Sequence, residues 1–99
     1  MADEVRLSRD AEVDLAAIAS YTADRFGEIQ ELRYRDGLRG ALEMLAMFPA
    51  MGAEQSHIVT GLRRHVYSSH AIYYSQQAYG IFIERILGPG HDPVREFES

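Results

Sequence analysis

The chain has 99 residues, a net charge of −5, 46% hydrophobic residues and no cysteine. A chain of this length has room for one domain with one modest core, because small chains bury only roughly 60% of their unfolded surface. Its composition is ordinary for a soluble globular protein. The lack of cysteine excludes disulfides and thiolate metal sites, and it is compatible with a reducing compartment.

The charge and the hydropathy pattern narrow the class of protein further. An acidic balance argues against a general nucleic-acid binder, because such proteins gain affinity by placing many cations on phosphates. All ten basic residues are arginines, and their planar guanidinium groups suit an acidic partner. The N-terminus has no apolar run of the secretory type, and no stretch approaches the roughly 20 apolar residues that span a membrane. We therefore expect a cytoplasmic protein without membrane association.

The first elements are a short strand and a helix. Val5 and Leu7 alternate with polar residues, which predicts a strand. Ser8 is a suitable N-cap for a helix over residues 9–26, and Gly27 is a natural C-terminal stop. Apolar positions at spacings of three and four line one face of this helix. They are Ala11, Leu15, Ile18, Thr22 and Phe26.

A second helix is predicted over residues 28–48, ended by Pro49 and Gly52. Its buried stripe is expected to contain Tyr34, Leu38, Ala41, Leu42, Leu45 and Phe48. Gly37 and Gly40 lie inside it, where they either let the first helix approach closely or are tolerated at about 1 kcal/mol each. The connection between the two helices is so short that they must lie antiparallel.

The second half of the chain reads as strands. A loop over residues 50–60 precedes predicted strands at 62–67, 71–75 and 79–87. Residues 88–99 begin with a Gly- and Pro-rich stretch that cannot continue a strand, and they form a candidate flexible tail.

The apolar faces predict the architecture. A hairpin of helices packed on one sheet buries both sets of apolar residues, which gives an α+β fold with an N-terminal strand, an antiparallel helical hairpin and a three-stranded antiparallel meander. Residues 1–99 form a single domain. The strand residues expected on the buried face are Val66, Ile72, Tyr74, Ile81, Ile83 and Leu87. Tyr73 and Tyr74 adjoin in one strand, so we expect Tyr74 inside and Tyr73 exposed on a half-polar functional face, where it would suit a binding anchor.

Several short motifs follow one another in a fixed order from about Val5 to Asp92. They are Leu7-Ser8-Arg9-Asp10-Ala11, Asp14-Leu15-Ala16-Ala17-Ile18, Tyr21, Leu45-Ala46-Met47-Phe48-Pro49, Gly52, Gly61-Leu62-Arg63, Ile72-Tyr73-Tyr74, Ile83-Glu84-Arg85-Ile86-Leu87 and Asp92. In this order and spacing the chain resembles the ParE branch of the RelE/ParE family of bacterial toxins from type II toxin–antitoxin modules. It departs from many members at Gly88, where they have a histidine, and at His91, where a basic or large residue is common.

The resemblance implies a toxin that inhibits DNA gyrase by binding, with no catalytic residue, cofactor or metal, and no direct nucleic-acid binding outside the antitoxin complex. It also implies a hetero-oligomer with a ParD-like antitoxin, whose disordered, acidic C-terminal segment folds on binding. The expected antitoxin contacts are two apolar anchors and four arginines: Tyr21, Leu32, Arg33, Arg35, Arg39 and Arg63. The expected target-binding or toxicity residues are Arg63, Tyr73, Arg85 and His91.

Other functions stay open at this point. RelE-like relatives are ribosome-dependent mRNA endonucleases, which need a general base, a general acid and cations on the phosphate. Arg63, His65 and Tyr67 alternate onto one strand face, and with Arg85 nearby they would form a phosphate clamp. The alternative interpretation of both arginines is a structural salt bridge or hydrogen bond, and a decayed module without toxicity is a third possibility. A metal site is not expected, because no ligand spacing connects His57, His65, His70 and His91.

Overall fold

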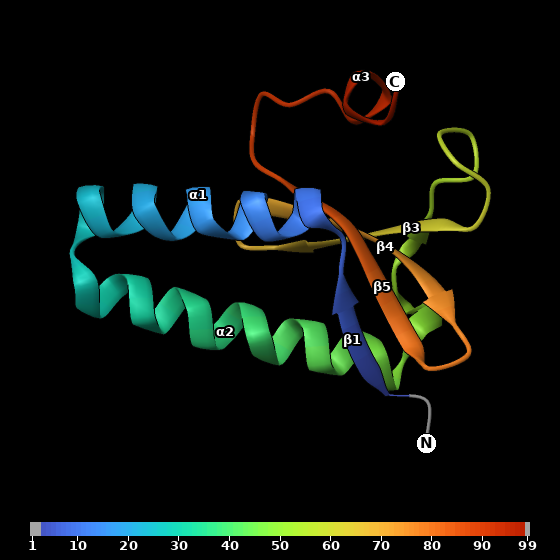
Figure 1. Ribbon diagram of the computed structural model, residues 1–99, viewed down its shortest axis with the longest axis horizontal. Coiled ribbons are helices and arrows are strands. Elements are labelled where there is room, and N and C mark those ends of the chain that lie inside the picture. The colour runs from blue at the N-terminus through green and yellow to red at the C-terminus, as the bar shows by residue number, and fades with distance from the viewer. Residues whose placement is uncertain (1–2, 99) are drawn as a thin grey trace.

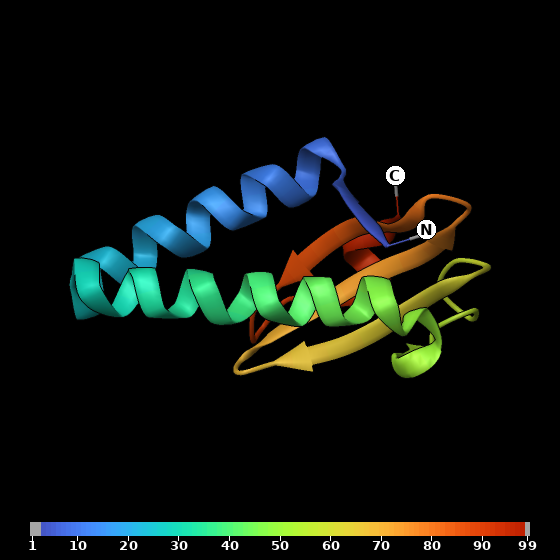
Figure 2. The same ribbon diagram turned by 90° about the horizontal axis from the view of Figure 1, so that it is seen from below.

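The computed structural model describes residues 3–98, which form a helical hairpin packed on a single sheet (Figures 1 and 2). In chain order the elements are β1 (Glu4–Leu7), α1 (Arg9–Phe26), α2 (Glu28–Met47), a 3-10 turn η1 (Pro49–Met51), β2 (Ala53–Glu54), β3 (Leu62–Tyr67), β4 (His70–Gln77), β5 (Gly80–Leu87) and α3 (Pro93–Phe97). The strand order is β1-β5-β4-β3-β2. Strand β1 runs parallel to β5, and the other neighbours are antiparallel. The predicted α+β architecture is confirmed. No helix within residues 3–98 is long and apolar enough to cross a membrane.

The hairpin forms because its ends are capped as the sequence predicts. The Ser8 hydroxyl accepts a hydrogen bond from the Ala11 N–H at 2.9 Å, which starts α1. The same hydroxyl donates to the Glu84 carbonyl at 2.6 Å, so the cap also fastens α1 to β5. Gly27 alone separates the two helices, in a left-handed backbone conformation with φ 89°. A single-residue connection leaves only the antiparallel arrangement.

The main core lies between the helices and the sheet. Its buried members are Ala11, Leu38, Ala41, Leu42, Leu45, Ala46, Ile72, Tyr74, Ile81, Ile83 and Ile86. Tyr74 is fully buried, as predicted. Its hydroxyl donates to the Pro49 carbonyl at 2.7 Å and accepts from the Gly52 N–H at 2.8 Å. A buried hydroxyl needs such partners, and these two fix the turn that leads from α2 into the sheet.

Two glycines permit close approaches. A Cβ at Gly80, where φ is 144°, would collide with the Glu4 backbone, so this glycine lets β1 pair beside β5. A Cβ at Gly37 would overlap the Tyr67 hydroxyl. Gly37 therefore makes room for a β3 side chain, which is neither of the two expected roles. A Cβ at Gly40 would meet nothing within 4 Å, which agrees with the alternative that this glycine is tolerated.

The predicted helix stripes extend too far at their ends. Phe26 is 64% exposed and Phe48 is 59% exposed, so the prediction that both lie in buried stripes is wrong. Phe26 ends α1, where the hairpin projects beyond the sheet, so the sheet does not cover its ring (Figures 1 and 2). Phe48 lies just beyond α2 with a non-helical backbone, so it no longer follows the helical face.

Two strand residues also lie on the other face of the sheet from the one predicted. Val66 is paired with Ala71 and is 47% exposed. Leu87 is buried, but in a second cluster on the face away from the hairpin. The register shifts beside Tyr73, so that Glu84 is an extra residue in β5 and reverses the alternation beyond it. A strict period of two cannot reveal such a bulge, which accounts for Leu87. The register of β3 with β4 is regular and places His65, not Val66, opposite Ile72.

Candidate functional site

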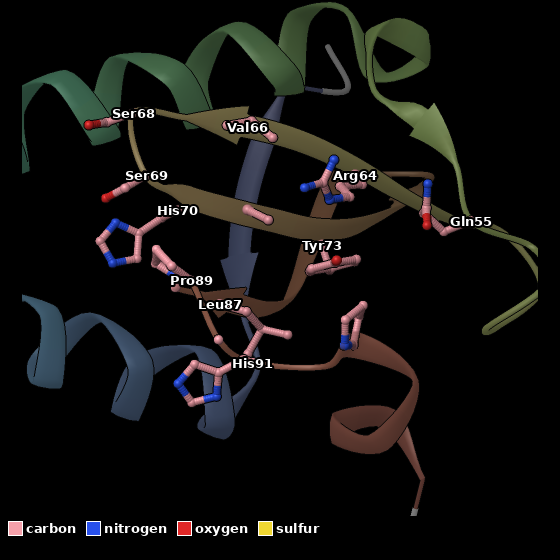
Figure 3. A pocket seen from close by; sticks show the side chains of 14 residues that line it. Gln55, Arg64, Val66, Ser68, Ser69, His70, Tyr73, Leu87, Pro89 and His91 are labelled. Carbon is pink, nitrogen blue, oxygen red and sulfur yellow. The ribbon is translucent and has the colours of Figure 1, made fainter.

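A groove of about 490 Å³ lies on the sheet face away from the hairpin (Figure 3). One wall comes from β3, β4 and the turn between them, and the other comes from the segment that follows β5. Its lining residues are Gln55, Arg64, Val66, Ser68, Ser69, His70, Ala71, Tyr73, Leu87, Gly88, Pro89, Gly90, His91 and Pro93. We call this the sheet-face groove. It collects Tyr73 and His91 from the predicted target-binding set.

Tyr73 is on the predicted face, but its ring is not exposed. Only 3% of Tyr73 is accessible, because Phe97 of α3 packs edge-on against it with ring centroids 5.5 Å apart. Leu62 and Leu87 complete this small second core. The expectation of an exposed tyrosine anchor is therefore wrong, because α3 covers the Tyr73 ring. The strand and helix patterns of the sequence do not predict this helix.

The α3 helix has a recognisable local cause. Asp92 is its N-cap and accepts a hydrogen bond from the Val94 N–H at 3.0 Å. Pro93 occupies the first turn, where its fixed φ favours a helix and its missing N–H costs nothing. The sequence signal of α3 is an aspartate directly followed by proline, within a stretch for which the sequence predicts a loop. The helix is short, so a hydrophobic period could not reveal it.

Arg85 holds three elements together. Its guanidinium donates to both Asp14 carboxylate oxygens at 2.9 Å and to Glu96 at 3.0 Å, while only 18% of its side chain is exposed. Asp14 also accepts the Ile86 N–H at 2.9 Å. These hydrogen bonds raise the pKa of Arg85, so it stays charged. The interpretation of Arg85 as a structural ion pair fits this geometry, and Asp14 is the partner that sequence reasoning missed.

Arg63 lies on the opposite side of the sheet from Arg85. It is paired with Tyr74, on the hairpin side, and donates to the Ala50 carbonyl at 3.2 Å and the Gly52 carbonyl at 2.6 Å. Arg85 is instead paired with Tyr73, on the other face. The structure therefore does not assemble the phosphate clamp in which Arg85 would join Arg63, and Arg63 braces the turn after α2.

His70 connects α2 to the β3–β4 turn. The Tyr34 hydroxyl lies 2.5 Å from His70 Nδ1, and burial raises the pKa of Tyr34 to about 12 while it lowers the pKa of His70. The phenol oxygen and Nδ1 therefore share one hydrogen, whose donor depends on the tautomer of the imidazole. His70 lines the sheet-face groove and two neighbouring cavities. It is therefore the residue that these three cavities share.

One of those cavities, of about 430 Å³, lies at the outer half of the hairpin. We call it the hairpin groove, and its lining includes Tyr21, Thr22, Phe26, Gln30, Tyr34, Ser68, Ser69 and His70. Tyr21 is 56% exposed, and the Arg25 guanidinium lies 5.4 Å from the centre of its ring. Together with Phe26, this tyrosine makes an accessible aromatic surface of the kind that anchors a partner.

The remaining predicted antitoxin contacts lie on α2 or elsewhere. Arg35 pairs with the buried Glu31 and lines a smaller cleft of about 270 Å³ between α1 and α2. Leu32, Arg33 and Arg39 are exposed but line neither cavity, and Arg39 pairs with Asp36. The structure thus brings Tyr21 into a groove, leaves three residues on an open helix surface, and places Arg63 beside the turn after α2. Within residues 3–98, no three histidine or acidic side chains are grouped to hold a metal ion.

Comparison with known proteins gives consistent matches. Residues 5–92 match the family described as ParE toxin of type II toxin–antitoxin system, parDE. The chain is 38% identical over 69 residues to Toxin ParE1 of Caulobacter vibrioides, a match that covers 70% of this chain and 72% of the relative. A solved structure of the chromosomal ParDE TA system from P. aeruginosa superposes with a TM-score of 0.74 at 20% identity, covering 88% of this chain and 96% of the other. That structural match shows a shared fold.

Proposed function

Because the chain belongs to the ParE toxin family of type II toxin–antitoxin systems, we propose that it inhibits DNA gyrase by binding and is neutralised by a ParD-like antitoxin. The family match over nearly the whole chain carries this proposal. The cytoplasm, where gyrase works on the chromosome, is the corresponding location.

The geometry favours inhibition by binding over RNA cleavage. The phosphate clamp predicted from the sequence would need Arg63 and Arg85 free to neutralise a phosphate in the transition state. Arg85 is instead occupied by Asp14 and Glu96, and Arg63 by two backbone carbonyls. Of the proposed toxicity residues, His91 is the accessible one, with 54% of its side chain exposed. We therefore assign target contact to His91 and to the surface around it.

The hairpin groove is the proposed antitoxin site. Its floor and rim expose Tyr21 and Phe26, and an amphipathic helix would lay its apolar face on these rings. Arg25 beside Tyr21, and Arg33 on the neighbouring helix, would pair with carboxylates on the polar face of such a segment. This combination of aromatic anchors and arginines suits an acidic, amphipathic partner.

Antitoxin binding can be tested with two matched variants on α1. Tyr21→Ala should weaken binding of the antitoxin by about tenfold or more, because a half-exposed aromatic anchor is typical of binding hot spots. Val13→Ala is the control, since Val13 is 61% exposed on the same helix and lines neither hairpin cavity. Binding is measured by calorimetry with the purified antitoxin. Equal loss in both variants would place the antitoxin elsewhere.

The target is tested with purified gyrase. The toxin should arrest supercoiling of relaxed plasmid, and prior addition of the antitoxin should restore it. His91→Ala should keep the fold and lose inhibition. Normal supercoiling in the presence of a toxin that stops growth would reject gyrase as the target, and transcripts cleaved at ribosomes after induction would favour the endonuclease instead.

A further inference from the structure

We propose that the sheet-face groove binds a nucleoside monophosphate, with its phosphate on Arg64, its sugar over the apolar floor and its base at the neutral donors of the β3–β4 turn. This inference does not rest on the proposed gyrase target or antitoxin. It starts from the charge of the groove. Acidic residues occupy 15 of the 99 positions of the chain, yet none of the residues that line the groove is acidic.

Two carboxylates close in sequence to the groove lining, those of Asp92 and Glu96, already have hydrogen-bond partners. Asp92 caps α3 by accepting the Val94 N–H. Glu96 accepts from Arg85 at 3.0 Å and lies 3.5 Å from His91. An anion in the groove would therefore contact hydrogen-bond donors and apolar surface. No carboxylate of the groove lining would repel it.

Arg64 is the cation available for a phosphate. It is exposed on β3 opposite Tyr73, and within residues 3–98 its guanidinium makes no ion pair or hydrogen bond with another side chain. The other arginine on this side of the sheet, Arg85, is paired with Asp14 and Glu96. A planar guanidinium with free N–H groups binds phosphate oxygens bidentately, which makes Arg64 the phosphate position.

Neutral hydrogen-bond donors gather at the other end of the groove (Figure 3). Ser68 and Ser69 contribute hydroxyls from the β3–β4 turn, and His70 follows directly. Because the Tyr34 hydroxyl lies on His70 Nδ1, Nε2 is the ring nitrogen left for another partner, and it lies on the side of Gly88 at the groove rim. Neutral donors of this kind suit the ring nitrogens and oxygens of a base better than a second phosphate.

An apolar floor separates the two polar ends. Val66 and Leu87 line the groove between Arg64 and His70 (Figure 3), and Ala71 lies beside Val66 on the neighbouring strand. A volume of about 490 Å³ lies within the range of small-molecule sites, which runs from about 300 to 1,000 Å³. The order cation, apolar surface and neutral donors matches the order phosphate, sugar and base in a mononucleotide.

The experiment is a titration of the full-length, ¹⁵N-labelled chain, followed by amide chemical shifts. The probes are AMP, inorganic phosphate and adenosine. AMP should give saturable shifts at residues 64–71 and 87–91, phosphate should shift mainly the surroundings of Arg64, and adenosine should bind most weakly. Arg64→Gln should weaken AMP binding by about tenfold, since hydrogen bonds to charged groups contribute most. Arg9→Gln removes the same charge from an exposed arginine on α1 and should leave AMP binding unchanged.

The other outcomes overturn the proposal. Absence of saturable shifts with AMP would show that the groove does not bind a nucleoside monophosphate. Adenosine that binds as tightly as AMP, or Arg64→Gln and Arg9→Gln with equal affinities, would show that the phosphate is not recognised there. A hexaglutamate peptide that shifts the same amides at lower concentration than AMP would make the groove a site for an acidic peptide. None of these titrations contains gyrase or antitoxin, so their failure leaves the proposed toxin function untouched.

Discussion

The two faces of the sheet are stabilised in different ways. The hairpin side carries the main core, where aliphatic side chains from α2 and the strands are buried together. The other side has a small cluster of Leu62, Tyr73 and Leu87 beneath a five-residue helix, and beside it an open groove. Figure 2 shows this division, with α2 across one side of the sheet and α3 behind it. One face therefore maintains the fold, and the other is free to bind.

The contrast predicts that the largest loss of stability follows from truncation on the hairpin side. Leu45 is fully buried, so Leu45→Ala should lower the free energy of unfolding by about 3 to 4 kcal/mol through lost apolar contact and a residual cavity. Met47→Ala, on the same helix, is the control because Met47 is 64% exposed. Urea denaturation measures both. Similar losses from the two variants would mean that α2 does not form the main core.

The second prediction concerns the ion pair that joins the two sides. Asp14→Ala should cost about 2 to 3 kcal/mol of unfolding free energy, because it leaves the partly buried Arg85 without its main partner and the Ile86 N–H without its acceptor. We expect a smaller loss of unfolding free energy than for a fully buried ion pair, because 18% of the Arg85 side chain is exposed. Asp24→Ala removes an exposed carboxylate from the same helix and should change stability by less than about 0.5 kcal/mol. If both variants unfold at the same urea concentration, Arg85 is not structural.

These contacts also show what the sequence could and could not predict. The cap at Ser8, the stop at Gly27 and the burial of Tyr74 follow from local chemistry and periodicity, and each is found. Asp14 and Arg85 are 71 positions apart, so only the folded topology reveals that they meet. Hydrophobic periodicity does not predict the short α3 helix, because its sequence signal is an N-cap residue followed by a proline.

The candidate site was less predictable than the fold. Tyr73 was correctly placed on the non-hairpin face, but its cover by Phe97 depends on a contact between distant segments. The sheet-face groove is built from a turn, a strand and a loop whose proximity no spacing rule encodes. Sequence periodicity assigns a residue to a face, whereas the neighbours on that face come from topology.

The third prediction tests the thinner cover of the groove side. Phe97→Ala should cost about 1 kcal/mol, because it removes an aromatic pair from a small and partly accessible cluster. It should also expose Tyr73, which solvent-dependent tyrosine fluorescence or the ring proton shifts can detect. Val94→Ala, at an exposed position of the same helix, should leave both stability and the Tyr73 signal unchanged. A loss as large as that of Leu45→Ala would remove the distinction between the two faces.

We expect the smallest effect on stability from a change of pH, which acts through His70. Burial lowers the pKa of His70 below its usual value of 6.5, so the unfolded chain takes up this proton more readily than the folded one. The resulting stability is fully present above about pH 6.5 and is lost as the pH falls through the folded pKa. Burial raises the pKa of Glu84, and that effect has the opposite sign, because its cost appears as the pH rises above about 4.5.

The His70 contribution can be isolated by comparing variants across the same pH range. His70→Gln should unfold with a shallower loss of stability between about pH 7.5 and 5.5 than the unmodified chain, while the Glu84 contribution is common to both and cancels. His57→Gln, at an exposed loop position, should follow the unmodified chain. The measurement is the urea midpoint at each pH. If His70→Gln and the unmodified chain have parallel curves, the imidazole titrates as freely in the folded protein as in the unfolded chain, and the Tyr34–His70 contact does not hold it in one protonation state.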